Sequence, residues 1–442
     1  MLLYLLERDP IDEGRSVEIG GTRWGLATHN LYKSDIKSIS FTCLSYVWGT
    51  KREPNPIHPT IDVSDRTRPA LEAVVAHRPS CKRIWVDAYC VPAEAPERNQ
   101  TLQSMGFVYS RAEEVITVLS STAQPVLQQM KVSNRLDRAH LDILEQEEWV
   151  TRAWTYQEVL NSQHLSMTCE GSDSAIIELN NFLNCLGFTL SHLKEAPSTS
   201  ARRALYPRLD TLEDLIADYL IAAYEEKSAL KVMSQMDRRC QHFSQDHFYA
   251  MMGAMSTVCC NMVETLDPCE AFMSACEEKG DYSFIYSTAK RDSSPTRRWR
   301  PASAGRLAPV ITWHCFGDGQ PGHKDKGSVY LDQVVLLKGG ALGVKSAEFI
   351  KAWLASSKME LPESLGLDVI VSAALEIMGF KGSSQGISTT HGFFFPMESL
   401  RSGEDSSIII ATNVQWAFGS PGLLQYRGGE KIYIPGVFFG RI

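Results

Sequence analysis

The sequence predicts an α/β fold that begins with a parallel sheet flanked by helices and ends in a β-rich region. Short apolar, β-prone runs alternate with segments of helical spacing through the first third of the chain. A mainly helical stretch follows, and the C-terminal quarter returns to short strands between Gly-rich turns. We therefore expect five regions: an N-terminal extension (1–35), an α/β domain (36–170), a mainly helical region (171–288), a loop-rich connection (289–328) and a β-rich C-terminal region (329–442).

Strands and helices are expected to alternate inside the α/β domain, which is typical of a parallel sheet covered on both faces. The first helix takes its apolar face from Leu71, Val74 and Val75, which follow helical spacing. The predicted strands are 40–47, 83–91 and 115–120, and the predicted helices are 68–77, 101–112 and 141–160.

Composition and charge restrict the class of protein. A hydrophobic content of 44% and a charged content of 22% are ordinary for a globular protein with a core. The net charge of -8 argues against a nucleic acid binder that depends on overall attraction to phosphates. The eleven cysteines contain no Cys-x-x-Cys pair or zinc-like spacing, and the first ten residues are too short for a signal peptide. We expect a cytoplasmic protein with reduced thiols, no metal, no cofactor and no membrane span.

Polar and aromatic residues stand at the ends of the predicted strands. The segment "LSYVWGT" places Ser45, Tyr46 and Trp48 before Gly49, and Asp87 stands in the next strand. In open α/β sheets the ligand crevice lies outside the carboxyl ends of the strands, where strand order reverses. These residues therefore predict a pocket at that edge. Asp87 either lines the pocket or forms hydrogen bonds to a neighbouring loop.

The helix 141–160 carries the strongest local signal. Trp154 and Glu158 are four residues apart and share a helix face, where a carboxylate beside a tryptophan is often desolvated. The alternative is a surface glutamate next to a core tryptophan. Glu148 and Arg152 have the same spacing and predict an ion pair on the helix surface.

Three other patterns do not carry a function. "GDGQPG" (317–322) matches a dinucleotide-binding pattern but leads into a strand, so the required helix is missing. A Cys-His hydrolase is disfavoured because Cys43 and Cys90 lie inside apolar strands. The basic segment 297–300 is expected to be a solvated loop, with contact to an anionic partner as the alternative.

Four ordered blocks of the α/β domain resemble the fungal heterokaryon incompatibility (HET) domain. The segment "DHFYAMMGAMS" (246–256) resembles a further block that follows this domain in larger members. "CVP" (90–92) departs from the more frequent Cys-Ile-Asn-Gln of the family. The four blocks are "LSYVWG" (44–49), "IWVDAYCV" (84–91), "SMGFVYSRAEEVITVL" (104–119) and "RAWTYQEVL" (152–160).

This resemblance implies a role in programmed cell death during non-self recognition. The HET domain has been likened to the Toll/interleukin-1 receptor (TIR) domain, a flavodoxin-like fold, and some TIR domains cleave NAD with a glutamate. In those TIR domains the glutamate stands in a Trp-Cys-x-x-Glu-Leu segment. Trp154 and Glu158 have the same Trp-to-Glu spacing, so the resemblance implies that Glu158 is catalytic and that NAD is the substrate. The competing interpretation is a non-enzymatic module that acts by self-association or by binding an unknown protein. The residues expected to bind the substrate are Ser45, Tyr46, Trp48, Gly49, Asp87, Arg152 and Trp154.

Overall fold

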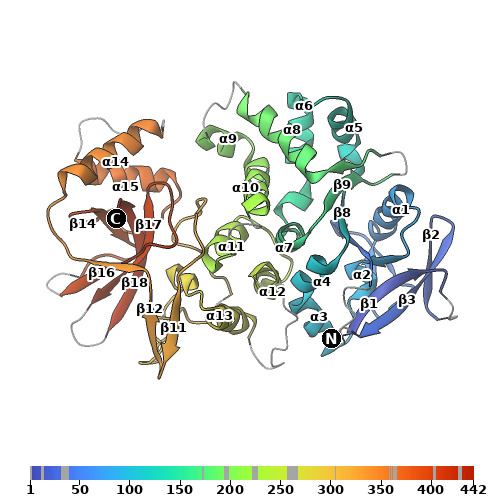
Figure 1. Ribbon diagram of the computed structural model, residues 1–442, viewed down its shortest axis with the longest axis horizontal. Helices are drawn as coiled ribbons and strands as arrows, with labels where there is room; N and C mark the ends of the chain where they lie inside the picture. The colour runs from blue at the N-terminus through green and yellow to red at the C-terminus, as the bar shows by residue number, and fades with distance from the viewer. Residues whose placement is uncertain are drawn as a thin grey trace. The chain divides into compact units, whose positions relative to one another are not determined.

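The computed structural model divides the chain into two compact units, residues 1–220 with 252–265 and residues 221–251 with 266–442 (Figure 1). We describe each unit by itself. The described residues are 2–10, 14–30, 39–171, 174–193, 199–221, 227–255, 267–303, 305–357, 359, 361, 366–401, 405–426 and 431–442.

The first unit is built on a mixed sheet of eight strands in the order β10-β9-β8-β4-β7-β1-β3-β2. Strands β9, β8, β4 and β7 run parallel, and the remaining neighbours pair antiparallel. Strands β5 (Arg52–Pro54) and β6 (Asp62–Ser64) form a separate hairpin. The sheet strands are β1 (Leu2–Arg8), β2 (Ser16–Ile19), β3 (Thr22–Asn30), β4 (Thr42–Tyr46), β7 (Arg83–Trp85), β8 (Glu114–Leu119), β9 (Leu165–Cys169) and β10 (Ile177–Glu178).

The four parallel strands confirm the predicted α/β fold. In chain order they are β4, β7, β8 and β9, so their spatial order is second, first, third, fourth, as in flavodoxin-like sheets. Strand order reverses between β4 and β8, which places the expected ligand crevice beyond the ends of these two strands. Residues 2–30, expected to form an extension before the domain, supply three strands of the same sheet.

Helices cover both faces of this sheet. Ser45 and Tyr46 are consecutive on β4, so their side chains point to opposite faces. Ser45 bonds to Glu158 on α7, whereas the Tyr46 hydroxyl bonds to Thr67 on α1 at 2.7 Å. The helices of this unit are α1 (Thr67–His77), α2 (Asp87–Cys90), α3 (Glu97–Gln103), α4 (Met105–Arg111), α5 (Gln124–Val132), α6 (Arg138–Glu145), α7 (Ala153–Asn161), α8 (Leu179–Ser191), α9 (Thr199–Leu205) and α10 (Pro207–Ile221).

Three predicted elements are interrupted in the structure. The strand predicted over 83–91 ends at Trp85, because Asp87 begins the short helix α2. The helix predicted over 101–112 is two helices, α3 and α4, which meet at Ser104. The helix predicted over 141–160 is also wrong. Glu147 and Arg152 adopt extended backbone conformations, which separate α6, a short 3-10 turn (Glu148–Thr151) and α7.

A close contact between glycines lets three helices pack in the first unit. A Cβ atom at Gly106 on α4 would overlap the carbonyl oxygen of Gly253 on α12 (Ser244–Met255). A Cβ atom at Gly253 would in turn overlap the amide of Gln157 on α7. Asn161 on α7 donates to the Gly253 carbonyl at 2.8 Å. The predicted block 246–256 therefore supplies packing for α7, and its last residue, Ser256, lies outside the described residues.

The second unit contains the β-rich C-terminal region that the sequence predicts. Its antiparallel sheet has the strand order β13-β16-β17-β18-β15-β14 and a core of Phe394, Ile408, Ile410, Leu424 and Phe438. Helix α14 packs on β15 and β18 and also contacts α15. The further elements of this unit are α11 (Ala229–Met236), α13 (Pro268–Lys279), β11 (Gly322–Asp325), β12 (Ser328–Leu331), β13 (Val334–Leu337), α14 (Val344–Ser356), α15 (Leu367–Ile377), β14 (Ile387–Ser388), β15 (Gly392–Pro396), β16 (Ser406–Ala411), β17 (Gly419–Tyr426) and β18 (Ile432–Gly440).

The basic segment 297–300 is not the solvated loop that its composition predicts. Arg300 is 2% exposed and pairs with Glu270 and Glu277, at 2.6 Å each. Trp299 is buried beside it. The segment is irregular in backbone but fixed by buried ion pairs, which costs less than leaving the guanidinium without a counter-charge.

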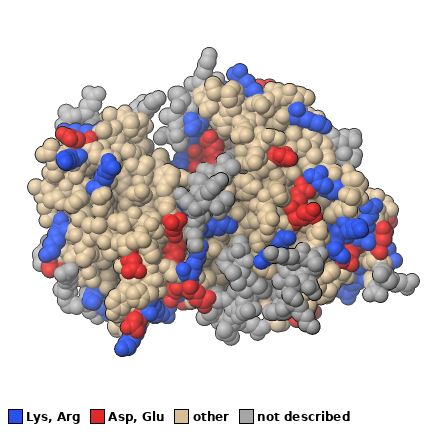
Figure 2. Space-filling model, viewed as in Figure 1, with Lys and Arg blue, Asp and Glu red and all other residues tan. Residues whose placement is uncertain are grey.

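Surface charge and hydropathy add two observations. Figure 2 shows acidic and basic side chains interspersed on the visible face, among a majority of other residues. This pattern differs from the single basic stripe that binds a nucleic acid backbone. Among the described residues, no helix combines the length and apolar character needed to span a membrane.

The glycine contact leads to a prediction about stability. We expect Gly106→Ala to lower the free energy of unfolding by about 1–3 kcal/mol, because the added methyl group would overlap a backbone carbonyl. The matched control is Gly187→Ala in α8, where an added Cβ atom would meet no heavy atom within 4 Å. That change should stabilise by about 0.5–1 kcal/mol through lower backbone entropy. Thermal melting compares the two variants, and equal melting temperatures would contradict the packing argument.

Candidate functional site

The predicted catalytic residue Glu158 lies beneath the surface, at the interface of β4 and α7. Its side chain is 6% exposed, and the Ser45 hydroxyl donates a hydrogen bond to its Oε2 atom. The Ser45 oxygen accepts in turn from the indole N–H of Trp149 at 2.8 Å. An indole nitrogen only donates, so the direction of the chain is fixed: Trp149 to Ser45 to Glu158. The alternative interpretation, a surface glutamate on this helix, is wrong.

Burial changes the acidity of Glu158. The pKa of Glu158 is raised to about 7. Desolvation is the main cause, and the nearby negative charge of Asp87 acts in the same direction. The Ser45 hydrogen bond, the Arg152 charge and the Tyr109 hydroxyl act in the opposite direction. A carboxyl with this pKa exchanges its proton near neutral pH, which suits a group that must change protonation state during a reaction.

A second carboxylate, Asp87, lies at the end of β7. Its Oδ2 atom accepts from the Trp48 indole N–H at 2.8 Å, and its Oδ1 atom accepts from the Ala88 backbone N–H at 2.7 Å. Asp87 therefore forms the hydrogen bonds to a neighbouring loop that one of its two expected roles requires, and its charge also acts on Glu158. Burial raises its pKa, and the positive charge of Arg152 opposes that shift.

Arg152 supplies the positive charge of this cluster. It precedes α7 in an extended conformation and donates to the Tyr46 carbonyl at 3.0 Å. The prediction that Glu148 and Arg152 share a helix face is wrong, because the helix is broken between the two residues. One guanidinium thus stabilises the charged forms of two carboxylates, the buried Glu158 and the half-buried Asp87.

The remaining predicted binding residues differ in their burial and in their contacts. The buried Tyr46 hydroxyl faces α1, within electrostatic reach of Asp87. Trp48 is half-buried, and its ring is covered by the guanidinium of Arg52 at 5.4 Å. Gly49 donates its N–H to Ser64 at 2.6 Å, and Asp65 fills the space beside it. Trp154 is half-buried on α7, one turn before Glu158.

Sequence reasoning missed two parts of the site. One is Trp149, which directs the Ser45 hydroxyl. The other is Glu147, which is 4% exposed and accepts from the side chain and backbone N–H of Ser120, the residue after β8. Burial raises the Glu147 pKa. Glu147 opens the segment that also carries Trp149 and Glu158, but its bond to Ser120 joins residues 27 apart in the chain, so no local pattern predicts it.

The cysteines and the histidine of this region are not arranged as a reactive thiol site. Cys43 and Cys90 are buried, and burial raises the pKa of both thiols, that of Cys90 to about 12. The His58 ring is hydrogen-bonded to the Tyr89 carbonyl at 2.9 Å. Among the described residues, no group of three or more His, Cys, Asp or Glu side chains has the arrangement of a metal site.

Comparison with protein families identifies the region that contains this cluster. Residues 41–158 match the family described as heterokaryon incompatibility protein (HET). The matched range covers about a quarter of the chain, starts beside β4 and ends at Glu158. It includes Ser45, Asp87, Trp149 and Arg152. No curated protein and no solved structure matches the chain.

The raised pKa of Glu158 predicts a pH-dependent stability difference. Between pH 4.5 and about 7, Glu158 keeps its proton in the folded state and loses it in the unfolded state. The contribution of this group to the free energy of unfolding is therefore full below pH 4.5 and is lost as the pH rises through 7. Glu158→Gln removes the buried charge, and we expect it to stabilise by about 2 kcal/mol at pH 8 and much less at pH 4.5. Thermal melting across this pH range measures the effect, with the exposed Glu148→Gln as control. A difference that does not vary with pH would argue against the shift.

Ser45→Ala should act on both ends of the hydrogen-bonded chain. It leaves the buried Trp149 N–H without its acceptor, which costs about 1–3 kcal/mol. It also removes a donor to the ionised carboxylate, so the Glu158 pKa rises further. The pH at which melting temperature falls should therefore move upward. An unchanged profile would show that Ser45 does not tune this carboxylate.

Proposed function

Residues 41–158 form a HET domain, and from this premise we propose that the protein acts in heterokaryon incompatibility, as a fungal cell-death signalling protein. The observation that carries this proposal is that the family match encloses one connected network. Ser45, Asp87 and the segment 149–158, which carries Trp149, Arg152 and Glu158, lie far apart in the sequence and are joined by hydrogen bonds and charges.

The reaction proposed for this network is hydrolysis of the bond between nicotinamide and ribose in NAD. Nicotinamide leaves a pyridinium as a neutral base, so the reaction requires no acid to protonate it. The bond electrons go to the ring, and water attacks the ribose carbon, giving ADP-ribose, nicotinamide and a proton. Ionised Glu158 would stabilise the oxocarbenium-like transition state, as a carboxylate does in glycoside hydrolysis.

Two features of the structure support this chemistry. The desolvated carboxylate has its pKa near neutrality, and it lies close to the strand ends where open α/β sheets bind ligands. Trp48, Asp87, Arg152 and Trp154 are half-buried, so each of these side chains is partly accessible to solvent. Substrate binding requires these side chains to move, because Ser45 occupies one Glu158 oxygen and Trp48 is bonded to Asp87.

The alternative function is a non-enzymatic module that signals by self-association or by binding a protein. The hydrogen bond from Ser45 to buried Glu158, with Trp149 behind it, favours this alternative, since such a network also stabilises a fixed interface between sheet and helix. In that case Glu158 acts on the conformation of α7 and not on a substrate.

Nicotinamide release by concentrated purified protein separates the two functions. For the enzyme we expect Glu158→Ala and Glu158→Gln to lose about 10²–10³-fold in rate, the loss found when transition-state charge stabilisation is removed. Because the ionised form of Glu158 is the active one, kcat/KM of the wild type should rise as the pH passes through about 7. The exposed Glu148→Gln is the matched control and should keep full activity.

Each negative outcome has a defined meaning. No nicotinamide release by concentrated wild-type protein rejects the enzyme proposal. Equal release by wild type and Glu158→Ala removes Glu158 from the mechanism. Sedimentation at increasing protein concentration tests the alternative, which expects assembly by wild type and weaker assembly by Glu158→Ala.

A further inference from the structure

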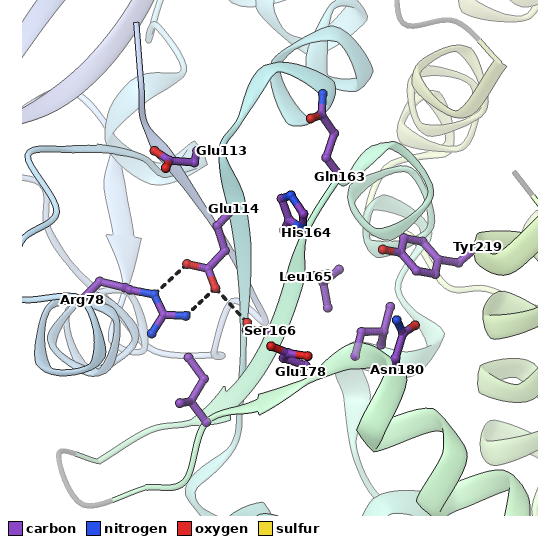
Figure 3. Close-up of a pocket in the computed structure, with 12 residues that line it drawn as sticks. Arg78, Glu113, Glu114, Gln163, His164, Leu165, Ser166, Glu178, Asn180 and Tyr219 are labelled. Carbon is purple, nitrogen blue, oxygen red and sulfur yellow. Dashed lines mark hydrogen bonds and ion pairs between the residues drawn. The ribbon is translucent and has the colours of Figure 1, made fainter. Parts of the chain in front are cut away.

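A cavity of about 570 Å³ lies at the edge of the first sheet opposite to the Glu158 cluster (Figure 3). It is lined by the residues that begin β8 and β9, by Arg78 after α1, by the start of α8 and by Tyr219 of α10. The length of β8, six residues at about 3.3 Å each, separates the two edges of the sheet. The volume is within the usual range for ligand sites.

Carboxylates outnumber the arginine and lysine side chains that line this cavity. Arg78 binds Glu114 with two hydrogen bonds of 2.8 and 2.6 Å, and Ser166 donates to the same carboxylate at 2.8 Å. Figure 3 shows this group on one wall. The positive charge of Arg78 is therefore already matched by Glu114. The lining carries two more carboxylates, Glu113 and Glu178.

Glu113 and Glu178 are exposed and lack a cationic partner. Glu113 accepts a hydrogen bond from the Ser40 hydroxyl, a neutral group. Glu178 precedes α8, and its side chain makes no capping hydrogen bond. Within the part of the chain that the structure describes, neither carboxylate forms an ion pair, so the cavity has an excess of negative charge at its rim.

Apolar side chains and one tyrosine also line this cavity. Leu165 and Leu179 are buried, and Figure 3 shows Tyr219 on the side opposite Arg78 and Glu114. The rim adds the exposed hydrogen-bonding side chains of Gln163, His164 and Asn180. Apolar side chains next to carboxylates that form no ion pair among the described residues are complementary to a side chain with an apolar stem and a cationic head.

We propose that this cavity binds an arginine side chain from a basic peptide segment of a protein partner. The planar guanidinium of arginine can donate two parallel hydrogen bonds to a carboxylate and can stack on the Tyr219 ring. The compact ammonium of lysine does both less well. The exposed amide and imidazole groups of the rim are placed to bond to the peptide backbone. Because the cavity is at the other edge of the sheet, this partner does not occupy the Glu158 region.

Fluorescence anisotropy with the full-length protein tests the proposal. The probe is a labelled peptide, acetyl-Gly-Leu-Arg-Leu-Gly, and its matched control replaces arginine with citrulline, which has the same shape without the charge. We expect saturable binding of the arginine peptide, with at least tenfold weaker binding of the citrulline peptide. Binding should weaken as salt is raised, because the rim charges are exposed.

Variants assign the binding to the cavity. The double variant Glu113→Gln and Glu178→Gln should weaken arginine-peptide binding about tenfold. The double control, Glu18→Gln and Glu148→Gln, changes two exposed carboxylates outside the cavity lining and should bind as wild type. The His164 ring resonance, assigned with His164→Gln, should shift on addition of the arginine peptide. Melting temperatures show that all four proteins are folded.

Three results would overturn the proposal. They are equal binding of the arginine and citrulline peptides, equal weakening by the cavity variant and the control variant, and no saturation at about 1 mM peptide. Spermidine and the unlabelled arginine peptide are also compared as competitors of the labelled peptide. If spermidine displaces the labelled peptide at the lower concentration, the occupant is a small polyamine, which contradicts a peptide partner.

Discussion

The placement of one carboxylate between a sheet and a helix organises the first unit. Glu158 is 6% exposed, and its position requires a donor, a compensating charge and a helix that approaches β4 closely. Ser45 supplies the donor, with its orientation fixed by Trp149, and Arg152 supplies the charge. Leaving such a carboxylate without these partners would cost several kcal/mol, so the surrounding backbone is constrained to provide them.

The break between α6 and α7 follows from this constraint. Arg152 has to leave the helical conformation to reach the Tyr46 carbonyl, and Glu147 leaves it where its side chain reaches Ser120 at the end of β8. The Gly106–Gly253 contact then allows α4, α7 and α12 to pack together. Local helix propensity over 141–160 is overridden by hydrogen bonds to two different strands.

The parallel sheet separates two chemically different edges. Beyond the carboxyl ends of its strands, carboxylates are buried, and their pKa values are raised by desolvation. At the amino ends, Glu113 and Glu178 are exposed and form no ion pair with any residue that the structure describes. Buried groups near neutral pKa suit a change of protonation state, whereas exposed charges suit recognition of an opposite charge. The two edges are joined by β8 and β9, whose strands begin at one and end at the other.

The sequence by itself determined the alternation of strands and helices, the β-rich C-terminal region and the HET resemblance, because apolar periodicity and ordered motifs are local properties. It also placed Ser45, Asp87 and Glu158 near one edge of a sheet. Only the tertiary structure decided that Glu158 is buried, that Trp149 and not Trp154 directs its partner, and that Arg300 is enclosed by carboxylates. These outcomes depend on contacts between residues distant in the chain, whose desolvation and pairing energies no local pattern contains.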